Sequence, residues 1–395
     1  MGFTGRSTKA FTAATRDGVS TASPPQRVLL VSNRVMHYRV SVYNYFWRHF
    51  REHGWDFAVI SNKIQSQNQI RPQFEFIECP FDFFRYRAEI QRINPDVVIL
   101  FLHLKELIFW PLIHWLKLVG IPVALWTKTR NLDDCENRIR NAFFDYVNCL
   151  SDGLILYNSS LTRFLPERCQ GKVFVANNTL NFEDYPVIPE SKEEIKRDLS
   201  IPFEKVVLFS GRIGEEQNRK KVDHLIDIFR EFDRSDVGLV IVGSGLSDEL
   251  RARMNPANTL YLGEVHDPEN RKISQIFKMA DICSIPGHVG LGINQAFFWG
   301  LPMVTERGNQ PPEIEYLRDG ENGFIVPEDD RLALRDRLLF LIGNDEERRR
   351  MSGNARRDIL TNASIEGMFH GFLSCVRYLS RRSSTPCMSK EQILQ

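Results

Sequence analysis

Short apolar runs recur along the chain and are separated by segments of helical length. The first series, rich in β-branched and other apolar residues, spans 27–32, 57–60, 74–77, 96–102, 121–126, 153–157 and 172–176. A second series spans 205–210, 238–243, 259–262, 281–285, 302–305 and 323–326. Continuous apolar strands that alternate with helices predict parallel sheets buried on both faces. Two such series therefore predict two doubly wound α/β domains.

The boundary between the two predicted domains lies in residues 181–201. This stretch contains Pro186, Pro189 and a charged segment, 190–197, which offers no apolar strand. Prolines and charge without an apolar run are typical of a linker between domains. We therefore predict three units: a first α/β domain over residues 27–185, a linker over 186–203 and a second α/β domain over 204–362.

The two ends of the chain fall outside these units. Residues 1–26 are rich in Ser, Thr, Ala and Gly and contain no apolar run, so we expect a disordered extension rather than a secretory signal. Apolar residues at helical spacing over about 365–381 predict a helix. We expect this C-terminal segment, 363–395, to pack back toward the first domain.

The net charge and the cysteine spacing narrow the classes of function that the protein can have. The formal net charge is +1, and the chain has 43% hydrophobic and 26% charged residues. This balance is typical of soluble proteins and argues against a nucleic-acid partner, because such binders carry a strongly basic surface. The seven cysteines include no Cys-x-x-Cys pair, which favours reduced thiols in a cytoplasmic protein without a zinc site.

Two cationic side chains follow the first strand of the second domain. The strand over 205–210 ends at Gly211, Arg212 comes next, and Lys220 stands where a helix should begin. Ligands of open α/β sheets bind outside the carboxyl ends of the strands, so both cations should reach the same crevice. The Arg guanidinium can donate two parallel hydrogen bonds to phosphate oxygens, and the Lys ammonium is a compact positive charge. Both groups are therefore suited to binding a diphosphate. A solvated basic turn also explains these charges.

A glycine-rich loop follows a later strand of the same domain. After the run 281–285 come Gly287, Gly290 and Gly292, and an apolar helical pattern begins at Ile293. A strand-to-helix loop of this kind points backbone N–H groups, and the positive end of the helix, toward a phosphate or a sugar hydroxyl. Glycines also serve tight packing, so the loop alone leaves both interpretations open.

The order and spacing of these segments resemble the donor-binding half of retaining glycosyltransferases of family 4, in particular the polysaccharide-assembly type. The resemblance covers about residues 205–358 and rests on these motifs: Gly211-Arg212, Lys220-x-Val222-Asp223, Val242-Gly243-Ser244-Gly245, Leu262-Gly263, Ala280-Asp281, Gly300-Leu301-Pro302 and Asp319-Gly320-x-Asn322-Gly323-Phe324. It implies the GT-B fold, in which two Rossmann-like domains face each other across a cleft. It also implies transfer of a hexosyl-type sugar (enzyme class 2.4) from a nucleotide sugar to a glycan or lipid-linked saccharide, with retention and without a metal ion or cofactor.

The resemblance assigns the donor site to the second domain. In such enzymes an Arg and a Lys bind the donor diphosphate, which implies catalytic roles for Arg212 and Lys220. The donor-binding residues that it implies are Gly211, Arg212, Lys220, Gly287, His288, Val289, Gly290, Leu291 and Gln295. The sequence departs from the family at one point, because Gly287 and Gln295 replace the usual two glutamates separated by seven residues. A glutamine amide can still hydrogen-bond a hydroxyl.

Candidate acceptor-side residues lie in the first domain. His37 and Arg39 follow the first strand, where they could contact an acceptor or a donor phosphate, although a solvated helix start explains them too. Lys128 follows the strand over 121–126, where many members of the family have a cleft histidine, which implies a catalytic role in stabilising negative charge. His103 is the alternative histidine, with a structural role at a helix start as its other interpretation.

The densest apolar segment of the first domain spans 104–119. Lys105, Glu106 and other polar residues interrupt it, so it is too short to span a bilayer. It predicts a helix on the first sheet, with a membrane-facing surface for a lipid-linked acceptor as the alternative. The mixed aromatic and cationic run 81–87 fits the same alternative. We therefore expect a cytoplasmic protein, with peripheral association at the inner membrane face as an open question.

Three other functions fit related folds. A non-catalytic partner that retains the GT-B fold would explain the missing glutamates but not the pair of Arg212 and Lys220. A sugar-nucleotide epimerase would require acid–base carboxylates that the motifs do not supply. A nicotinamide-dependent oxidoreductase would need a Gly-x-Gly-x-x-Gly turn after the first strand, which the sequence lacks. We therefore favour the glycosyltransferase.

Overall fold

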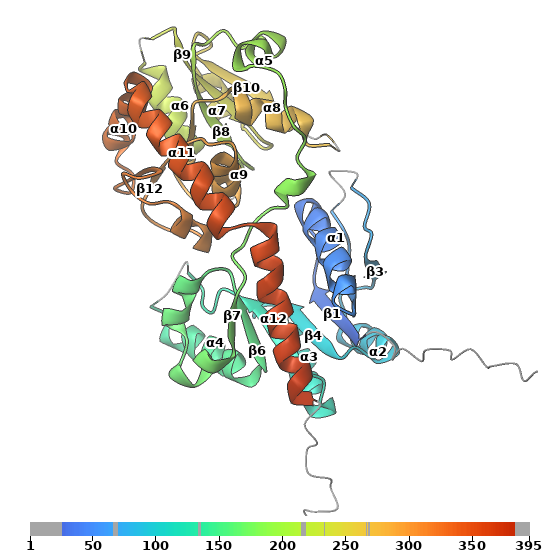
Figure 1. The fold of residues 1–395 in the computed structure, drawn as a ribbon. Helices are drawn as coiled ribbons and strands as arrows, with labels where there is room; N and C mark the ends of the chain where they lie inside the picture. Colours follow the sequence, from blue (N-terminus) through green and yellow to red (C-terminus); the bar gives the residue numbers. More distant parts are fainter. Residues whose placement is uncertain are drawn as a thin grey trace, which may run out of the picture.

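The chain folds into two α/β domains, which form separate lobes in Figure 1. The computed structural model describes residues 26–65, 70–132, 136–214, 219–232, 234–265, 267 and 269–383. Residues 1–25 of the extension expected at residues 1–26 lie outside this description, as do the last residues, 384–395.

A seven-stranded sheet forms the centre of the first domain, with the strand order β3-β2-β1-β4-β5-β6-β7. The strands are β1 (Gln26–Ser32), β2 (Trp55–Ser61), β3 (Glu75–Glu78), β4 (Val97–Phe101), β5 (Val123–Thr127), β6 (Gly153–Leu156) and β7 (Val173–Val175). All of these strands pair in parallel, and the register places Val28 between Phe57 of β2 and Val97 of β4. Each strand coincides with one apolar run of the first series.

Helices connect the strands of the first domain. They are α1 (His37–Glu52), α2 (Phe83–Ile93), α3 (Phe109–Val119) and α4 (Arg138–Leu150), with the short turns η1 (Ser159–Phe164), η2 (Glu167–Lys172) and η3 (Phe182–Asp184). Local sequence explains their ends. The Asp82 carboxylate accepts from two backbone N–H groups at the start of α2, and Gly120 takes a left-handed conformation after α3.

The second domain contains a six-stranded sheet with the order β10-β9-β8-β11-β12-β13. The strands are β8 (Lys205–Ser210), β9 (Val237–Val242), β10 (Thr259–Gly263), β11 (Ile282–Ser284), β12 (Met303–Glu306) and β13 (Gly323–Val326). All pair in parallel, as their buried apolar sequences predict. The strand order reverses between β8 and β11. Such a switch point is where open α/β sheets bind ligands, at the carboxyl ends of the strands.

The helices of the second domain cover its sheet. They are α5 (Lys192–Asp198), α6 (Val222–Arg230), α7 (Asp248–Arg253), α8 (Arg271–Met279), α9 (Gly292–Phe298), α10 (Arg331–Gly343) and α11 (Asp345–Asn362), with the turn η4 (Pro312–Tyr316). Ser191 and Glu194 form a capping box at the start of α5. At the start of α11, the backbone N–H of Glu347 donates to the side-chain oxygen of Asn344.

The last helix, α12 (Ile365–Ser383), leaves the second domain and returns to the first (Figure 1). Its apolar face belongs to the first hydrophobic core, where the Phe372 ring lies 4.7 Å from Phe46 and 5.0 Å from Trp126. The second core consists of residues from Ile188 to Ala363 alone. Each domain therefore has its own core, and α12 ties the end of the chain to the first.

The segment 104–119 contains α3, and its tryptophans pack inward. The side chain of Trp115 is only 9% exposed, and the Trp110 Nε1 donates to the carbonyl oxygen of Leu104 at 3.0 Å. The exposed large apolar side chains of this segment are instead Leu107, Leu118 and Val119, at 87%, 85% and 47%. In the part of the chain that the structure describes, no helix is long and apolar enough to cross a membrane.

Candidate active site

Lys220 lies at the switch point of the second sheet. Its Nζ donates to the carbonyl oxygens of His288 and Val289, at 2.9 and 3.2 Å, and so joins the loop after β8 to the glycine-rich loop after β11. Burial of the ammonium group lowers the pKa of Lys220 to about 8, although the negative charge of Glu313 opposes this shift. A cation with few water contacts at this edge is suited to an anionic ligand.

Glycine is required at two points around Lys220. A Cβ on Gly211 would stand 2.7 Å from the Cδ and Cε of Lys220, so a larger residue would displace the lysine stem. A Cβ on Gly287 would stand 2.0 Å from the carbonyl oxygen of Arg219. The two loop backbones are hydrogen-bonded at this point, because the N–H of His288 donates to the same carbonyl oxygen at 2.6 Å. The glycine pattern in the sequence therefore reflects close approach of two loops beside one lysine.

The other predicted donor-side residues differ in how they lie relative to Lys220. Arg212 is exposed, directly after Gly211. Val289 is buried in the core, and Gly290 has a positive φ of 56°. Gln295, one turn into α9, donates to the Tyr185 hydroxyl at 3.5 Å. Lys220 and the loop thus lie together, while Arg212 reaches outward and Gln295 contacts the interdomain segment.

Gln310 supports the glycine-rich loop, a role that sequence reasoning missed. Its Nε2 donates to the carbonyl oxygens of Gly287 and Glu306, both at 2.9 Å, and its Oε1 accepts from the N–H of Val289 at 3.1 Å. Thr305 donates to the carbonyl oxygen of Ile285 at 2.7 Å. Side chains from β12 and from the segment after it therefore fix the loop after β11, and no local sequence signal indicates these contacts.

An ionic cluster with a buried centre lies next to Lys220, and its outer carboxylates, Glu328 and Asp329, are exposed. Glu306 is fully buried, and its carboxylate accepts from His224 Nδ1 at 2.6 Å, from Lys221 Nζ at 3.1 Å and from the N–H of Asp329 at 3.0 Å. Burial alone would raise the pKa of Glu306, but these hydrogen bonds lower it below its ordinary value. Lys221 also donates to Asp329 at 2.7 Å and to Glu328 at 3.2 Å.

This cluster fixes the backbone that carries Lys220. Lys221 has a φ of 50°, a left-handed conformation that costs a residue with a side chain about 1 kcal/mol or more. Its three carboxylate partners offset that cost. His224, Glu306 and Asp329 offer ligand atoms within 4.8 Å of one another, but the Lys221 ammonium already bonds two of these carboxylates. The cluster is therefore best understood as an anchor for the turn at Lys220 and Lys221.

The predicted acceptor-side residues gather at the carboxyl edge of the first sheet. His37 is the first residue of α1, and Arg39 is buried, with its guanidinium 4.6 Å from the ring centre of Trp126. Lys128 follows β5, with its ammonium 5.6 Å from the Tyr157 ring. His103 follows β4; burial lowers its pKa, although the charge of Glu106 opposes this shift. Arg39 and Lys128 thus each lie against an aromatic ring at this edge, and His103 follows the neighbouring strand.

A polar chain connects this edge to the second domain. Arg39 Nη2 donates to Asn178 Oδ1 at 2.6 Å, and Asn178 Nδ2 donates to Glu313 at the start of η4. Asn158, after β6, donates to the carbonyl oxygen of Pro312 at 2.7 Å. Asn294 of α9 donates to the carbonyl oxygen of Asn178 at 3.0 Å. The carboxyl edges of the two sheets therefore meet through buried hydrogen bonds.

Residues 204–344 match the family model described as "Glycosyl transferases group 1". This range holds Lys220, both loops and the ionic cluster. Among curated proteins, the chain is similar to a phosphatidyl-myo-inositol mannosyltransferase of Mycobacterium leprae, with 33% identity over 37% of this chain and 39% of the relative. It is also similar to spore coat protein SA of Bacillus subtilis, with 26% identity over 47% and 52%. The chain thus spans about half or less of the length of these relatives.

Solved structures match over most of the chain. Sucrose-phosphate synthase of Thermosynechococcus elongatus superposes with a TM-score of 0.69 at 17% identity, covering 90% of this chain and 100% of that one. The Anabaena protein HepE, solved with UDP, gives 0.70 at 13% identity, covering 89% and 100%. These likenesses confirm the predicted fold: two α/β domains with parallel sheets, matching GT-B glycosyltransferases.

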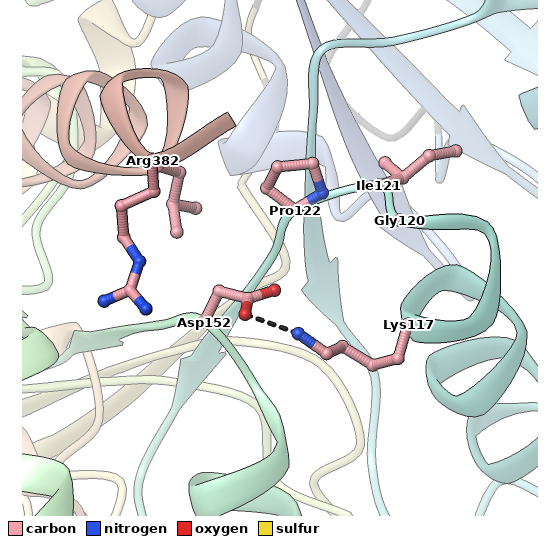
Figure 2. Close-up of a pocket in the computed structure, with 7 residues that line it drawn as sticks. Lys117, Gly120, Ile121, Pro122, Asp152 and Arg382 are labelled. Atoms are coloured by element: carbon pink, nitrogen blue, oxygen red, sulfur yellow. Dashed lines mark hydrogen bonds and ion pairs between the residues drawn. The ribbon is translucent and has the colours of Figure 1, made fainter. Parts of the chain in front are cut away.

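One hollow lies away from this site. Figure 2 shows it at the amino ends of β5 and β6, where Lys117 pairs with Asp152 and Arg382 approaches from α12. Its volume is about 220 Å³. Ligands of doubly wound domains bind at the opposite, carboxyl edge, so the hollow does not form part of the candidate site.

Proposed function

We propose that this protein is a glycosyltransferase that moves a sugar from a nucleotide-sugar donor to a glycan or lipid-linked saccharide. The observation that carries the proposal is the half-buried ammonium of Lys220 between two glycine-flanked loops at the switch point, in a domain that matches group 1 glycosyl transferases. A GT-B likeness that includes structures solved with UDP and with UDP-glucose supports a nucleotide-sugar donor.

In this proposal the donor diphosphate lies beside Lys220. The bond from the anomeric carbon to the phosphate oxygen breaks, and negative charge collects on the leaving diphosphate. Lys220 and the exposed Arg212 would stabilise that charge, and preorganised charge of this kind is usually the largest contribution to catalysis. The anchored Lys221 turn would keep Lys220 in place without reorganisation. We propose retention and no metal ion, as the family resemblance implies.

The acceptor would bind on the first domain. His37, His103 and Lys128 lie at the carboxyl edge that meets the second domain through Asn178. Lys128, as a cation, would stabilise the donor phosphate rather than remove a proton. We further propose that a lipid-linked acceptor draws the first domain to the inner membrane face, with exposed Leu107 and Phe143 as the contact.

A non-catalytic partner is the second candidate, and one observation favours it. Gly287 and Gln295 occupy the positions where the resemblance expects two glutamates. Gly287 bonds only through its backbone, while Gln295 already contacts Tyr185. Donor binding with no turnover of any nucleotide sugar would support this candidate.

Thermal unfolding in the presence of nucleotides tests the proposal. The wild type would be scanned with nucleoside diphosphates and nucleotide sugars, beside Lys220→Met and the matched surface variant Lys272→Met on α8. A ligand at 100 times its Kd adds about 2.7 kcal/mol of stability. We expect one nucleotide to stabilise the wild type and Lys272→Met but not Lys220→Met. Stabilisation of all three would place the ligand elsewhere, and stabilisation of none would contradict a donor site.

A further inference from the structure

Two thiols meet at the edge of the first domain, outside the candidate active site. Cys149 lies in the last turn of α4, and Cys169 lies in the turn η2, twenty residues later. Their Sγ atoms are 2.9 Å apart. Cys169 is fully buried, whereas Cys149 is partly exposed. A partly exposed cysteine is therefore in direct contact with a buried one.

Cationic groups surround Cys149. The Nε of exposed Arg168 donates to its Sγ at 3.0 Å, and Lys172 Nζ donates to its carbonyl oxygen at 2.9 Å. Burial would raise the pKa of the Cys149 thiol, but the hydrogen bonds from Cys169 and Arg168 lower it below its ordinary value. Burial and the hydrogen bond with Cys149 raise the pKa of Cys169 to about 11. Cys149 is therefore the more acidic of the two thiols.

The other described thiols have different surroundings. Cys79 donates to the carbonyl oxygen of Pro80 at 3.7 Å, and burial raises its pKa. Burial also raises the pKa of Cys283 to about 12. Among the described residues, the one group with three possible metal ligands contains neither Cys149 nor Cys169. Packing in the core explains a single buried thiol. It does not explain Cys149, which is partly exposed, contacts a second thiol and accepts a hydrogen bond from a cation.

We propose that Cys149 and Cys169 form a reversible disulfide, with Cys149 as the attacking thiolate and hydrogen peroxide as the oxidant. The Cys149 sulfur attacks one peroxide oxygen, the O–O bond breaks, and a sulfenic acid forms as hydroxide leaves and takes up a proton. The Cys169 sulfur then attacks the Cys149 sulfur, the S–O bond breaks, and water leaves. Two thiols and one peroxide thus give one disulfide and two waters, and an external dithiol reverses the step by exchange.

The geometry requires little movement for this bond. A disulfide has sulfurs about 2.05 Å apart, so the two side chains must approach by less than ~1 Å. The bond would join the end of α4 to η2 and close a loop that contains β6 and Asn158. Because Asn158 donates to Pro312 of the second domain, the cross-link would restrain the segment that leads to the domain contact. The inference does not depend on the proposed transfer reaction.

Peptide mapping of the full chain tests the proposal. Trypsin cuts after Arg140, Arg163, Arg168 and Lys172, so the two cysteines fall on peptides 141–163 and 169–172. The reduced protein would be treated with hydrogen peroxide, the remaining thiols blocked with N-ethylmaleimide, and the protein digested without reductant. We expect the two peptides to be joined with the loss of two hydrogen atoms, and to separate after treatment with dithiothreitol. The oxidised protein should also unfold at a higher temperature than the reduced one.

Three variants sharpen the result. Cys149→Ser should abolish the joined peptide, and Cys79→Ser should leave it unchanged. Arg168→Gln should slow the alkylation of Cys149 by iodoacetamide at neutral pH severalfold, because a thiolate without its cation is less populated. The proposal fails if Cys149 stays a thiol, stops at the sulfinic acid, or joins another cysteine or a second molecule. The wild-type map alone decides among these outcomes, so a variant that does not fold would not weaken the test.

Discussion

The ammonium group of Lys220 donates to the carbonyl oxygen of His288 at 2.9 Å, across the point where the strand order of the second sheet reverses. Through this contact, one lysine holds the glycine-rich loop and also supplies a positive charge beside it. A bound diphosphate would offer stronger acceptors than two carbonyl oxygens, since ionised partners make the stronger hydrogen bonds. Binding should therefore draw the ammonium from the loop toward the ligand.

Replacing Lys220 should abolish most turnover. In Lys220→Met the stem still fills the space beside Gly211, but the charge on the leaving diphosphate loses its nearest cation. We expect kcat to fall about 10²- to 10³-fold, the loss seen when one preorganised stabilising group is removed. Initial rates with the donor found by thermal unfolding would measure it. Lys272→Met, at an exposed position of α8, should retain full activity, and equal losses in both variants would contradict the assignment.

The pH dependence of donor binding should report the same group. Because burial lowers the pKa of Lys220 to about 8, the free protein loses this positive charge as the pH rises through 8. A diphosphate binds the protonated form better, so its affinity should be constant below pH 7 and fall above pH 8. Titration of the Kd from pH 6 to 10 would show this decline. In Lys220→Arg, whose guanidinium stays charged, the decline should vanish, and its persistence would assign it to another group.

Glu306 should stabilise the fold beneath the site. Removing its charge in Glu306→Gln leaves His224 and Lys221 without their buried partner, and such a loss costs about 3–5 kcal/mol. Chemical denaturation near neutral pH would measure it. Glu328→Gln is the matched control, because this half-exposed partner of Lys221 should contribute no more than about 1 kcal/mol. Similar losses would show that burial does not set the strength of these pairs.

Acid should remove the stability that Glu306 contributes. Its pKa in the folded protein lies below the ordinary value of 4.5, because hydrogen bonds from His224, Asp329 and Lys221 outweigh the effect of burial. Its contribution is therefore complete above about pH 4.5 and decreases as the pH falls toward the folded pKa. The free energy of unfolding of Glu306→Gln should decline less steeply with acid than that of the wild type. Parallel curves would contradict the shift.

The sequence predicts the strands well because of their burial. Central strands such as β1 and β9 are buried along almost their whole length, so their apolar runs show no polar alternation and are easily distinguished from the amphipathic helices; the edge strand β3, exposed at both ends, is the weaker signal. Gly211 and Gly287 were recognisable for a similar reason, since only glycine permits the close approach of two loops. Both features are recognisable from a few neighbouring residues in the sequence, so they can be predicted without knowledge of the fold.

The supporting contacts of the site carry no such signal. Glu306 lies 82 residues from His224, and Asn178 lies 135 residues from Glu313. Pairs so distant in sequence meet only after both sheets have formed, and each residue alone looks like an ordinary polar position in a loop or helix. The pairing of Cys149 with Cys169 was hidden in the same way, because α4 and η2 approach each other only around β6.

Asn178 should couple the two domains. Asn178→Ala removes the acceptor of Arg39 and the donor to Glu313 together, and leaves both buried charged groups short of a partner. We expect a loss of about 2–3 kcal/mol in the free energy of unfolding. The neighbouring Asn177→Ala provides a control, since Asn177 is only half-buried and donates to a backbone carbonyl of Asn362. Equal effects would show that any polar contact at this junction serves as well as the Arg39–Asn178–Glu313 chain.

Membrane binding, if the acceptor is lipid-linked, should depend on exposed side chains rather than on tryptophans. Trp110 and Trp115 face inward, whereas Leu107 is 87% and Phe143 is 52% exposed, and the Phe143 ring lies 5.7 Å from Trp110. Leu107→Ser with Phe143→Ser should weaken binding to anionic vesicles at least ~10-fold, since each apolar side chain that leaves water contributes about 1.5–3 kcal/mol. Vesicle sedimentation would measure it. Leu332→Ser, on α10 of the second domain and 64% exposed, should bind like the wild type; if it weakens binding equally, the contact is not specific to the first domain.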